Sequence, residues 1–326
     1  YLGKTLSREY FQPVGDLDIM ILDTLTFEEF LDAEGKRDLY NSVDLYGKSS
    51  HEAYDELKRY YDLYCQIGGY PAVVKTYLET RDMEICQAEL DRVIHIFTEE
   101  SQGYFDNVLD INLFGQLLPA VAQTMIREKK GSVDLITELS KIVYKQESSR
   151  LSKKSINQAI AWLYRSHILD FCGKANDCNP TDISANSRFY FLDVGVCRSF
   201  LDMAGADLPT LRGIVNENFV YIDLLKRVRS RKISGTAPMF GLYKEGEIDF
   251  LVNSRENYKT YGVEVKSGKT EGKTAQLLLK DEKVEAVYFL KGDTYGGIAD
   301  RKVTVPIYLV GRMQFDFVKE HTPGSS

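Results

Sequence analysis

The sequence predicts a multidomain chain that combines purely α-helical parts with an α/β part. Apolar residues recur at helical spacing over residues 51–127, and two helical patterns followed by two apolar runs cover residues 132–193. Helix and strand patterns then alternate over residues 206–315. Helical stripes must be buried against one another, whereas alternating helices and strands are typical of an α/β sheet. We therefore expect a helical bundle, a second small domain and an α/β domain, in that order.

Composition and charge narrow the class of protein. The chain has 326 residues, which is more than one domain usually holds, and 44% of them are hydrophobic. It lacks an apolar run long enough to cross a membrane, so we expect no membrane partner. Five cysteines without paired spacing argue against a disulfide framework and favour a cytoplasmic setting. The net charge of −7 excludes a uniformly basic nucleic-acid protein, so such contacts must come from local patches.

The first half of the chain carries clear helix signals. Thr26 and Glu29 have the spacing of a capping box, so a helix should begin at Phe27. A later helix should end at Gly68-Gly69, because glycine stops helices and Pro71 follows. We expect further helices over residues 72–80, 83–105 and 112–127, and a strand around residues 18–22.

The next segment has the element order of a winged helix. Helical patterns cover residues 132–143 and a second stretch up to residue 165, and apolar runs at residues 168–171 and 189–192 flank a predicted polar loop, 173–188. The second helix carries four basic residues, Arg150, Lys153, Lys154 and Arg165. They either contact DNA phosphates or form a solvated helix face, and the sequence leaves both readings open.

The last third contains the residues with the clearest chemistry. A helix over residues 213–225 places Glu217 on its apolar face, where a carboxylate needs a metal, a lysine or an arginine beside it. Strand patterns follow at residues 247–252 and 261–266, joined by a short polar linker. A turn centred on residues 256–257 would place Asp249 opposite Glu264, and Glu247 opposite Lys266.

Two facing carboxylates repel each other unless a cation lies between them. Mg²⁺ binds through one or two carboxylates and leaves room for a phosphate oxygen. We therefore expect Asp249 and Glu264 to hold Mg²⁺, Lys266 to assist attack on a phosphodiester, and Glu217 to complete the acidic shell. The alternative is a hairpin whose charged residues are merely exposed to solvent.

Other motifs give weaker indications. Gly272-Lys273-Thr274 resembles a phosphate loop, but Ser267 stands where the first glycine of that loop is required, so no cofactor-binding residues are assigned. A basic run ends the Glu217 helix and comprises Lys226, Arg227, Arg229, Arg231 and Lys232. Cations at a helix C-terminus are favourable in any case, so a phosphate-binding role for this run is left open.

Several short motifs together resemble the C-terminal portion of prokaryotic AAA-type ATPases that end in a winged helix and a PD-(D/E)xK nuclease-like domain. The motifs occur in the order of that family: residues 15–31, Gly68-Gly69-Tyr70-Pro71, residues 189–195, residues 216–220, residues 247–250 and residues 264–268. The resemblance implies an ATPase whose nucleotide site lies before residue 1. The chain as given is therefore expected to bind ATP only when that core is present.

The resemblance also implies a division into parts. Residues 1–33 would be a remnant of the ATPase core, residues 34–127 a helical lid bundle, and residues 128–205 a winged helix. Residues 206–315 would form a restriction-endonuclease-like α/β domain, and residues 316–326 a loose tail. The expected function is a Mg²⁺-dependent, DNA-interacting nuclease-like module, with a non-catalytic DNA- or protein-binding module as the alternative. Homo-oligomer formation is left open.

Overall fold

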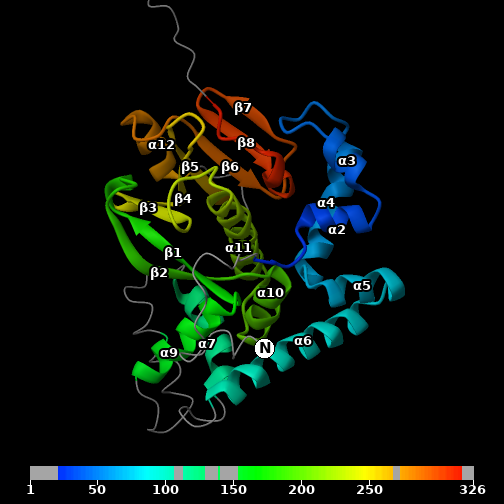
Figure 1. Ribbon diagram of the computed structural model, residues 1–326. Coiled ribbons are helices and arrows are strands. Elements are labelled where there is room, and N and C mark those ends of the chain that lie inside the picture. Colours follow the sequence, from blue (N-terminus) through cyan, green and yellow to red (C-terminus); the bar gives the residue numbers. More distant parts are fainter. Residues whose placement is uncertain (1–20, 106–112, 129–138, 140–152, 267–271, 318–326) are drawn as a thin grey trace, which may run out of the picture. The chain divides into compact units, whose positions relative to one another are not determined.

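A computed structural model of the chain describes residues 21–105, 113–128, 139, 153–266 and 272–317 (Figure 1). The fold is mixed, with helices and an eight-stranded sheet. The chain forms two compact units, and neither is one continuous stretch. The first unit comprises Tyr1–Thr26, Tyr64–Asp170 and Phe189–Ala206, and the second comprises Phe27–Leu63, Phe171–Arg188 and Asp207–Ser326.

The first unit is built from helices that pack through apolar faces. Its helices are α5 (Pro71–Thr80), α6 (Met83–Phe105), α7 (Leu113–Glu128), α9 (Lys153–Arg165) and α10 (Val194–Met203). Helix α6 contacts α5 and α7, and α10 contacts both α6 and α7. The predicted helices at residues 72–80, 83–105 and 112–127 are thereby confirmed to within one residue at each end. The first predicted helix of the winged pattern, residues 132–143, lies outside the described residues apart from Leu139, as do residues 1–20 of the N-terminal segment.

A close approach of two glycine-containing segments organises this unit. Asp193 caps α10 by accepting the N–H groups of Gly195 and Val196 at 2.9 and 3.0 Å, and it also accepts the N–H of Gly69 at 2.8 Å. A Cβ atom on Gly195 would lie 2.7 Å from the backbone nitrogen of Gly68. Only glycine allows the two backbones to meet at this distance, which explains the glycines in both segments.

The second unit is built on the sheet. Its helices are α2 (Phe27–Ala33), α3 (Arg37–Ser42), most of α4 (His51–Ile67), α11 (Leu208–Arg229) and α12 (Lys273–Lys280). Its strands are β3 (Met239–Tyr243), β4 (Gly246–Asn253), β5 (Thr260–Lys266), β6 (Val287–Lys291), β7 (Gly297–Ala299) and β8 (Lys302–Pro306), followed by the 3₁₀ helix η2 (Ile307–Arg312). Helix α2 begins at Phe27, and α4 ends at Ile67, directly before Gly68. Both positions are as predicted.

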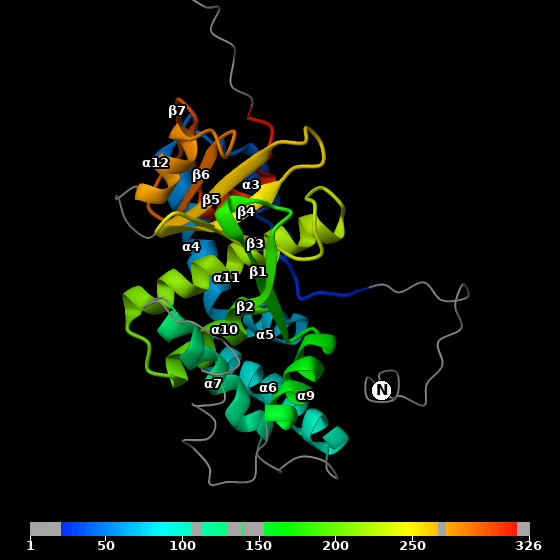
Figure 2. The same cartoon turned by 90° about the vertical axis from the view of Figure 1, so that its left-hand side faces the viewer.

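The sheet mixes antiparallel and parallel pairing. Its order is β2-β1-β3-β4-β5-β6-β8-β7. The β3–β4, β4–β5 and β7–β8 pairs are antiparallel, whereas β1–β3, β5–β6 and β6–β8 are parallel pairs. Helix α11 contacts β5, and α12 contacts β4 and β5 (Figure 2). Both helices therefore pack against strands that carry the predicted site residues Asp249, Glu264 and Lys266.

The predicted polar loop at residues 173–188 is only partly a loop. Strand β1 spans Leu169–Ala175 and β2 spans Ile183–Phe191, with a short 3₁₀ helix, η1 (Asn176–Cys178), between them. Residues Gly173–Ala175 of β1 pair in parallel with Met239–Gly241 of β3, so this hairpin belongs to the eight-stranded sheet. The sequence did not indicate where β1 ends and β2 begins, because residues 173–188 are polar and lack the alternation of apolar residues that predicts strands.

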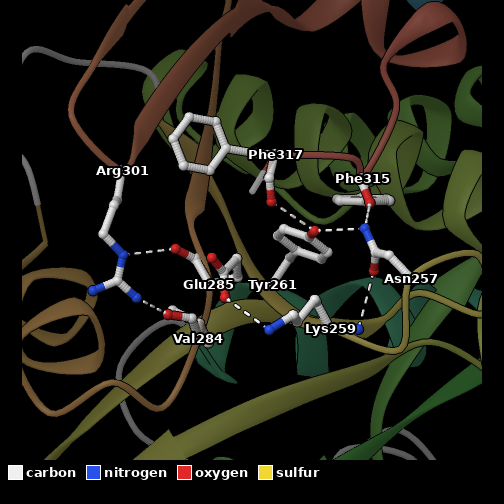
Figure 3. A network of polar contacts seen from close by, with 8 residues as sticks. All are labelled: Asn257, Lys259, Tyr261, Val284, Glu285, Arg301, Phe315 and Phe317. Atoms are coloured by element: carbon white, nitrogen blue, oxygen red, sulfur yellow. Dashed lines mark hydrogen bonds and ion pairs between the residues drawn. The ribbon is translucent and has the colours of Figure 1, made fainter. Parts of the chain in front are cut away.

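A polar network fixes the end of the described chain against the sheet (Figure 3). Tyr261 donates its hydroxyl to the carbonyl of Phe317 at 2.8 Å, and Asn257 donates to the carbonyl of Phe315 at 2.8 Å. Nearby, the guanidinium of Arg301 donates to the backbone carbonyls of Leu279, Val284 and Glu285. A buried cation that satisfies three carbonyls is a structural element, and it ties the start of β8 to α12 and to the loop before β6.

We predict that Gly195→Ala destabilises the first unit, because the new methyl group would overlap the backbone around Gly68. Overpacking of this kind typically costs about 1–3 kcal/mol. Chemical denaturation followed by circular dichroism should show a lower midpoint. Gly103→Ala is the matched control, since no atom lies within 4 Å of a Cβ there and alanine favours the surrounding helix. Equal midpoints for the two variants would contradict the prediction.

Candidate functional site

The β4–β5 hairpin brings the predicted acidic residues together. The register pairs Phe250 with Val263 and Asn253 with Thr260, which is the register expected from the sequence. Next to the Phe250–Val263 pair, the carboxylate of Asp249 accepts the N–H of Val265 at 2.7 Å. Asp249 therefore lies beside Glu264 on the neighbouring strand, as predicted.

Glu264 and Lys266 form the centre of the cluster. Glu264 is only 3% exposed, and its Oε1 lies 2.5 Å from the Nζ of Lys266. Its second oxygen, Oε2, is buried and has no hydrogen-bond partner among the residues that the structure describes. A buried carboxylate oxygen without a donor is costly, so the cluster has capacity for one further cation or donor.

The electrostatics of the cluster follow from burial and from mutual repulsion. Burial, followed by the charges of Glu264 and Glu217, holds the pKa of Asp249 well above its usual range. Burial also raises the pKa of Glu264, although the hydrogen bond from Lys266 acts in the opposite direction. Burial acts to lower the pKa of Lys266, but its hydrogen bond to Glu264 and the charges of Asp249 and Glu264 outweigh it, so that pKa is raised. The ionisation of Asp249 and that of Glu264 therefore depend on each other.

Arg188 is a member of this site that the sequence did not indicate. Its Nη1 lies 3.6 Å from Oε1 of Glu217, and its Nη2 lies 2.8 Å from Oε2 of Glu247. The guanidinium carbon lies 3.9 Å from the ring centroid of Phe240. The cation that faces Glu217 is thus an arginine. Arg188 was missed because it falls at the end of the predicted polar loop; its position directly before the apolar run 189–192 was the available signal.

Glu217 lies on α11 as predicted, and its side chain is only partly exposed. The neighbouring apolar residues Ile214, Val220 and Leu224 are buried, which confirms the predicted apolar face. Although Arg188 faces it, Glu217 still contributes to the raised pKa of both Asp249 and Glu264. The helix glutamate therefore belongs electrostatically to the acidic pair.

The donor atoms of this cluster can be compared with the ligands that a divalent ion requires. Among the residues that the structure describes, no group of three or more His, Cys, Asp or Glu residues has the geometry of a metal site. Asp249 and Glu264 nevertheless offer carboxylate oxygens, which Mg²⁺ prefers, and one of them is the unpartnered Oε2 of Glu264. The residues fit a site with two protein carboxylates and waters, which is an ordinary arrangement for Mg²⁺.

The predicted nucleic-acid residues belong to the first unit. Lys154 and Arg165 lie exposed on α9, whose opposite face buries Ile156 and Leu163. Arg150 lies outside the described residues, as does the side chain of Lys153. The described part of α9 is thus amphipathic. An exposed basic face is required both for phosphate binding and for a helix face that is merely solvated, so it does not distinguish between these two interpretations.

Comparison with known proteins gives one match. Residues 58–207 match the model of a family described as a domain of unknown function, DUF8612. The match covers less than half of the chain; it includes Arg188 but ends before Glu217. Searches of curated proteins and of solved structures found no match. Within the described part of the chain, no helix combines the length and the apolar character needed to cross a bilayer, and all five cysteines are buried free thiols.

We predict that Asp249→Asn stabilises the metal-free protein at pH 8 but not at pH 4. The pKa of Asp249 is raised in the folded state, so folding favours the protonated form. The free energy of unfolding therefore falls as pH rises from about 4, the unfolded pKa, through the folded pKa. Asparagine removes this loss because it carries no charge. Thermal unfolding in EDTA across this pH range measures the effect.

Asp281→Asn is the control of opposite sign. Hydrogen bonds from Lys244 and Tyr243 lower the pKa of Asp281. Its contribution to stability is present above the unfolded pKa of about 4 and is lost as pH falls through the folded pKa. This variant should therefore have a lower midpoint at pH 8. The interpretation of the acidic cluster is wrong if both variants change stability in the same direction at pH 8.

Proposed function

We propose that the second unit is a Mg²⁺-dependent, nuclease-like module that hydrolyses DNA phosphodiesters. The observation that supports this most is the pairing of Asp249 and Glu264 across the β4–β5 hairpin, with Lys266 in contact with Glu264. The element order α11-β3-β4-β5-α12-β6 supports a restriction-endonuclease-like fold, because it places a helix glutamate, a strand aspartate and a Glu-x-Lys strand in succession.

Each residue has a defined part in this proposal. Asp249 and Glu264 would hold the ion, and the unpartnered Oε2 of Glu264 is a ready ligand. A bound Mg²⁺ supplies water activation and neutralises charge on the transferring phosphate. The Lys266 ammonium, which is about one-third exposed, orients the attacking water or offsets charge on the scissile phosphate.

Glu217 completes the acidic shell, and Arg188 sets its position. Arg188 bridges Glu217 on α11 to Glu247 on β4, so it fixes the helix carboxylate relative to the strand that carries Asp249. A guanidinium held between two carboxylates restricts both side chains. Such restriction favours catalysis, because a metal site requires its ligands in one arrangement.

DNA is the proposed partner of the whole chain. The winged-helix reading of residues 128–205 would place Lys154 and Arg165 against phosphates, in agreement with their exposure on α9. We propose ATP binding and an AAA-type motor only for a longer protein that contains the nucleotide-binding core, and a cytoplasmic setting for that protein. Homo-oligomer formation is consistent with such a motor.

A non-catalytic binding module is the second candidate, and one feature favours it. Lys266 contacts Glu264 at 2.5 Å and Arg188 contacts Glu217 and Glu247. These ion pairs offset much of the charge of the cluster without a metal. The nuclease-like fold would then serve to bind DNA or a protein.

A cleavage assay separates the two candidates. The purified chain should cut supercoiled, linear, single-stranded or branched DNA only with Mg²⁺ or Mn²⁺. Asp249→Ala and Glu264→Gln should each reduce the rate by about 100-fold or more, because they remove a metal ligand or a charge. Glu52→Gln changes the charge equally at an exposed site of the same unit and should leave the rate unchanged.

Metal binding provides the second measurement. Paramagnetic Mn²⁺ should bind to the unaltered chain and to the Glu52→Gln variant, and should bind weakly to Asp249→Ala. Absence of cleavage on all four DNA forms, together with Mn²⁺ binding that Asp249→Ala does not alter, would exclude the nuclease and leave the binding module.

A further inference from the structure

Two adjoining loops of the second unit form a surface that the acidic cluster does not use. We call residues 229–234 and 253–260 together the basic tip. The N–H of Ser234 donates to the carbonyl of Asn253 at 2.9 Å, and the N–H of Arg255 donates to the carbonyl of Lys232 at 3.0 Å. An antiparallel bridge joins Ile233 and Ser254. The end of α11 and the β4–β5 turn are thus held side by side by their backbones (Figure 2).

The charge of the basic tip is opposite to that of the chain. The tip contains five cations, Arg229, Arg231, Lys232, Arg255 and Lys259, and one acid, Glu256. Its formal charge is therefore 5 − 1 = +4, whereas the whole chain carries −7. Lys259 lies 3.6 Å from Glu285. In the described part of the chain, Arg231, Lys232 and Arg255 are exposed and have no ion pair.

An aromatic residue projects from the same surface in an unusual backbone conformation. Tyr258 is 85% exposed, and its φ is 60°, in the left-handed region that bulky residues rarely adopt. Arg231 on the adjoining loop also has a φ of 60°. Such conformations persist only where the surroundings impose them, and they concentrate at binding surfaces.

The surroundings of Tyr258 are rigid. The side chain of Asn257 donates to the hydroxyl of Tyr261 and to the carbonyl of Phe315, both at 2.8 Å, and its Oδ1 accepts the N–H of Lys259 at 3.0 Å (Figure 3). The N–H of Tyr258 itself donates to the carbonyl of Ser254 at 3.0 Å. The turn is therefore fixed on both sides of Tyr258, and its ring is exposed to solvent.

We propose that the basic tip binds a nucleic-acid strand, with Tyr258 stacking on a base and Arg231, Lys232 and Arg255 contacting phosphates. A fixed exposed ring among exposed cations is the combination that sequence-tolerant strand binding requires. The inference rests on the proposed function for the choice of a nucleic acid. It goes beyond that function because it assigns a binding surface outside the acidic cluster and outside the first unit.

The geometry connects this surface to the cluster. Asp249 and Arg255 lie on the same hairpin, roughly 20 Å apart at the rise of a β-strand. Glu217 and Arg229 lie on the same helix, also separated by roughly 20 Å at the helical rise. At 3.4 Å per nucleotide, about six nucleotides of a duplex strand span this distance. A strand held by the tip can therefore reach the acidic cluster.

Binding of a labelled oligothymidylate to the full chain in EDTA tests the proposal without any cleavage step. Replacing Arg231, Lys232 and Arg255 together by serine should weaken binding about 100-fold near 0.1 M salt, and should reduce the slope of log K against log salt by about 2. The matched control replaces Lys48, Arg59 and Lys280, three exposed cations of the same unit, by serine. This control should leave the salt slope unchanged.

Variants of Tyr258 distinguish the contribution of base stacking to binding from that of the phosphate contacts. Tyr258→Asn should weaken binding about 5- to 150-fold, since base stacking is lost while asparagine tolerates the left-handed conformation. Tyr258→Phe should bind as the unaltered chain does. Thermal unfolding should show that Tyr258→Asn is no less stable, so the loss cannot be attributed to misfolding.

Three outcomes would overturn the proposal. They are absence of oligonucleotide binding, equal losses for the serine variant and its control, and a serine variant that loses binding to phosphatidylserine vesicles but not to the oligonucleotide. Tip-dependent binding without cleavage under any condition would support the basic tip and reject the proposed nuclease. Cleavage with unchanged binding by the tip variants would reject the basic tip alone.

Discussion

The second unit depends on two carboxylates, one buried and one half-buried, that face each other across one hairpin. Asp249 and Glu264 are brought together by the backbone register, and repulsion and burial both oppose their ionisation. The cost of such a pair must be offset by donors and cations nearby. The N–H of Val265 and the ammonium of Lys266 meet this requirement on the hairpin itself.

The charge balance of the cluster explains how it can accept an ion. Among the described residues, the carboxylates of Glu217, Glu247, Asp249 and Glu264 face two cations, Arg188 and Lys266. With every group ionised, the sum is −4 + 2 = −2, and burial together with the neighbouring carboxylates raises the pKa of Asp249. A divalent cation would offset this negative charge. Metal affinity in this site should accordingly be linked to pH.

The sequence predicted features with a local signal and missed those without one. The register of the hairpin followed from strand periodicity and a polar turn, and the helix ends followed from Gly68 and Pro71. Arg188 could not be found in this way, because its partners Glu217 and Glu247 are distant in sequence. The parallel pairing of β1 with β3 left no local pattern for the same reason. Interactions between remote segments were therefore the unpredictable part of both the fold and the site.

The same hairpin carries the acidic cluster near one end and the basic tip at the other. Its turn is fixed by Asn257, and its strands are fixed by ladders on both sides, β3 with β4 and β5 with β6. Because a paired strand cannot shorten or bend independently of its neighbours, the separation between Asp249 and Tyr258 is set by the sheet. A strand of nucleic acid bound at the tip would thus meet the carboxylates at one defined distance along its backbone. The hairpin register, which pairs the two acids, determines that distance as well.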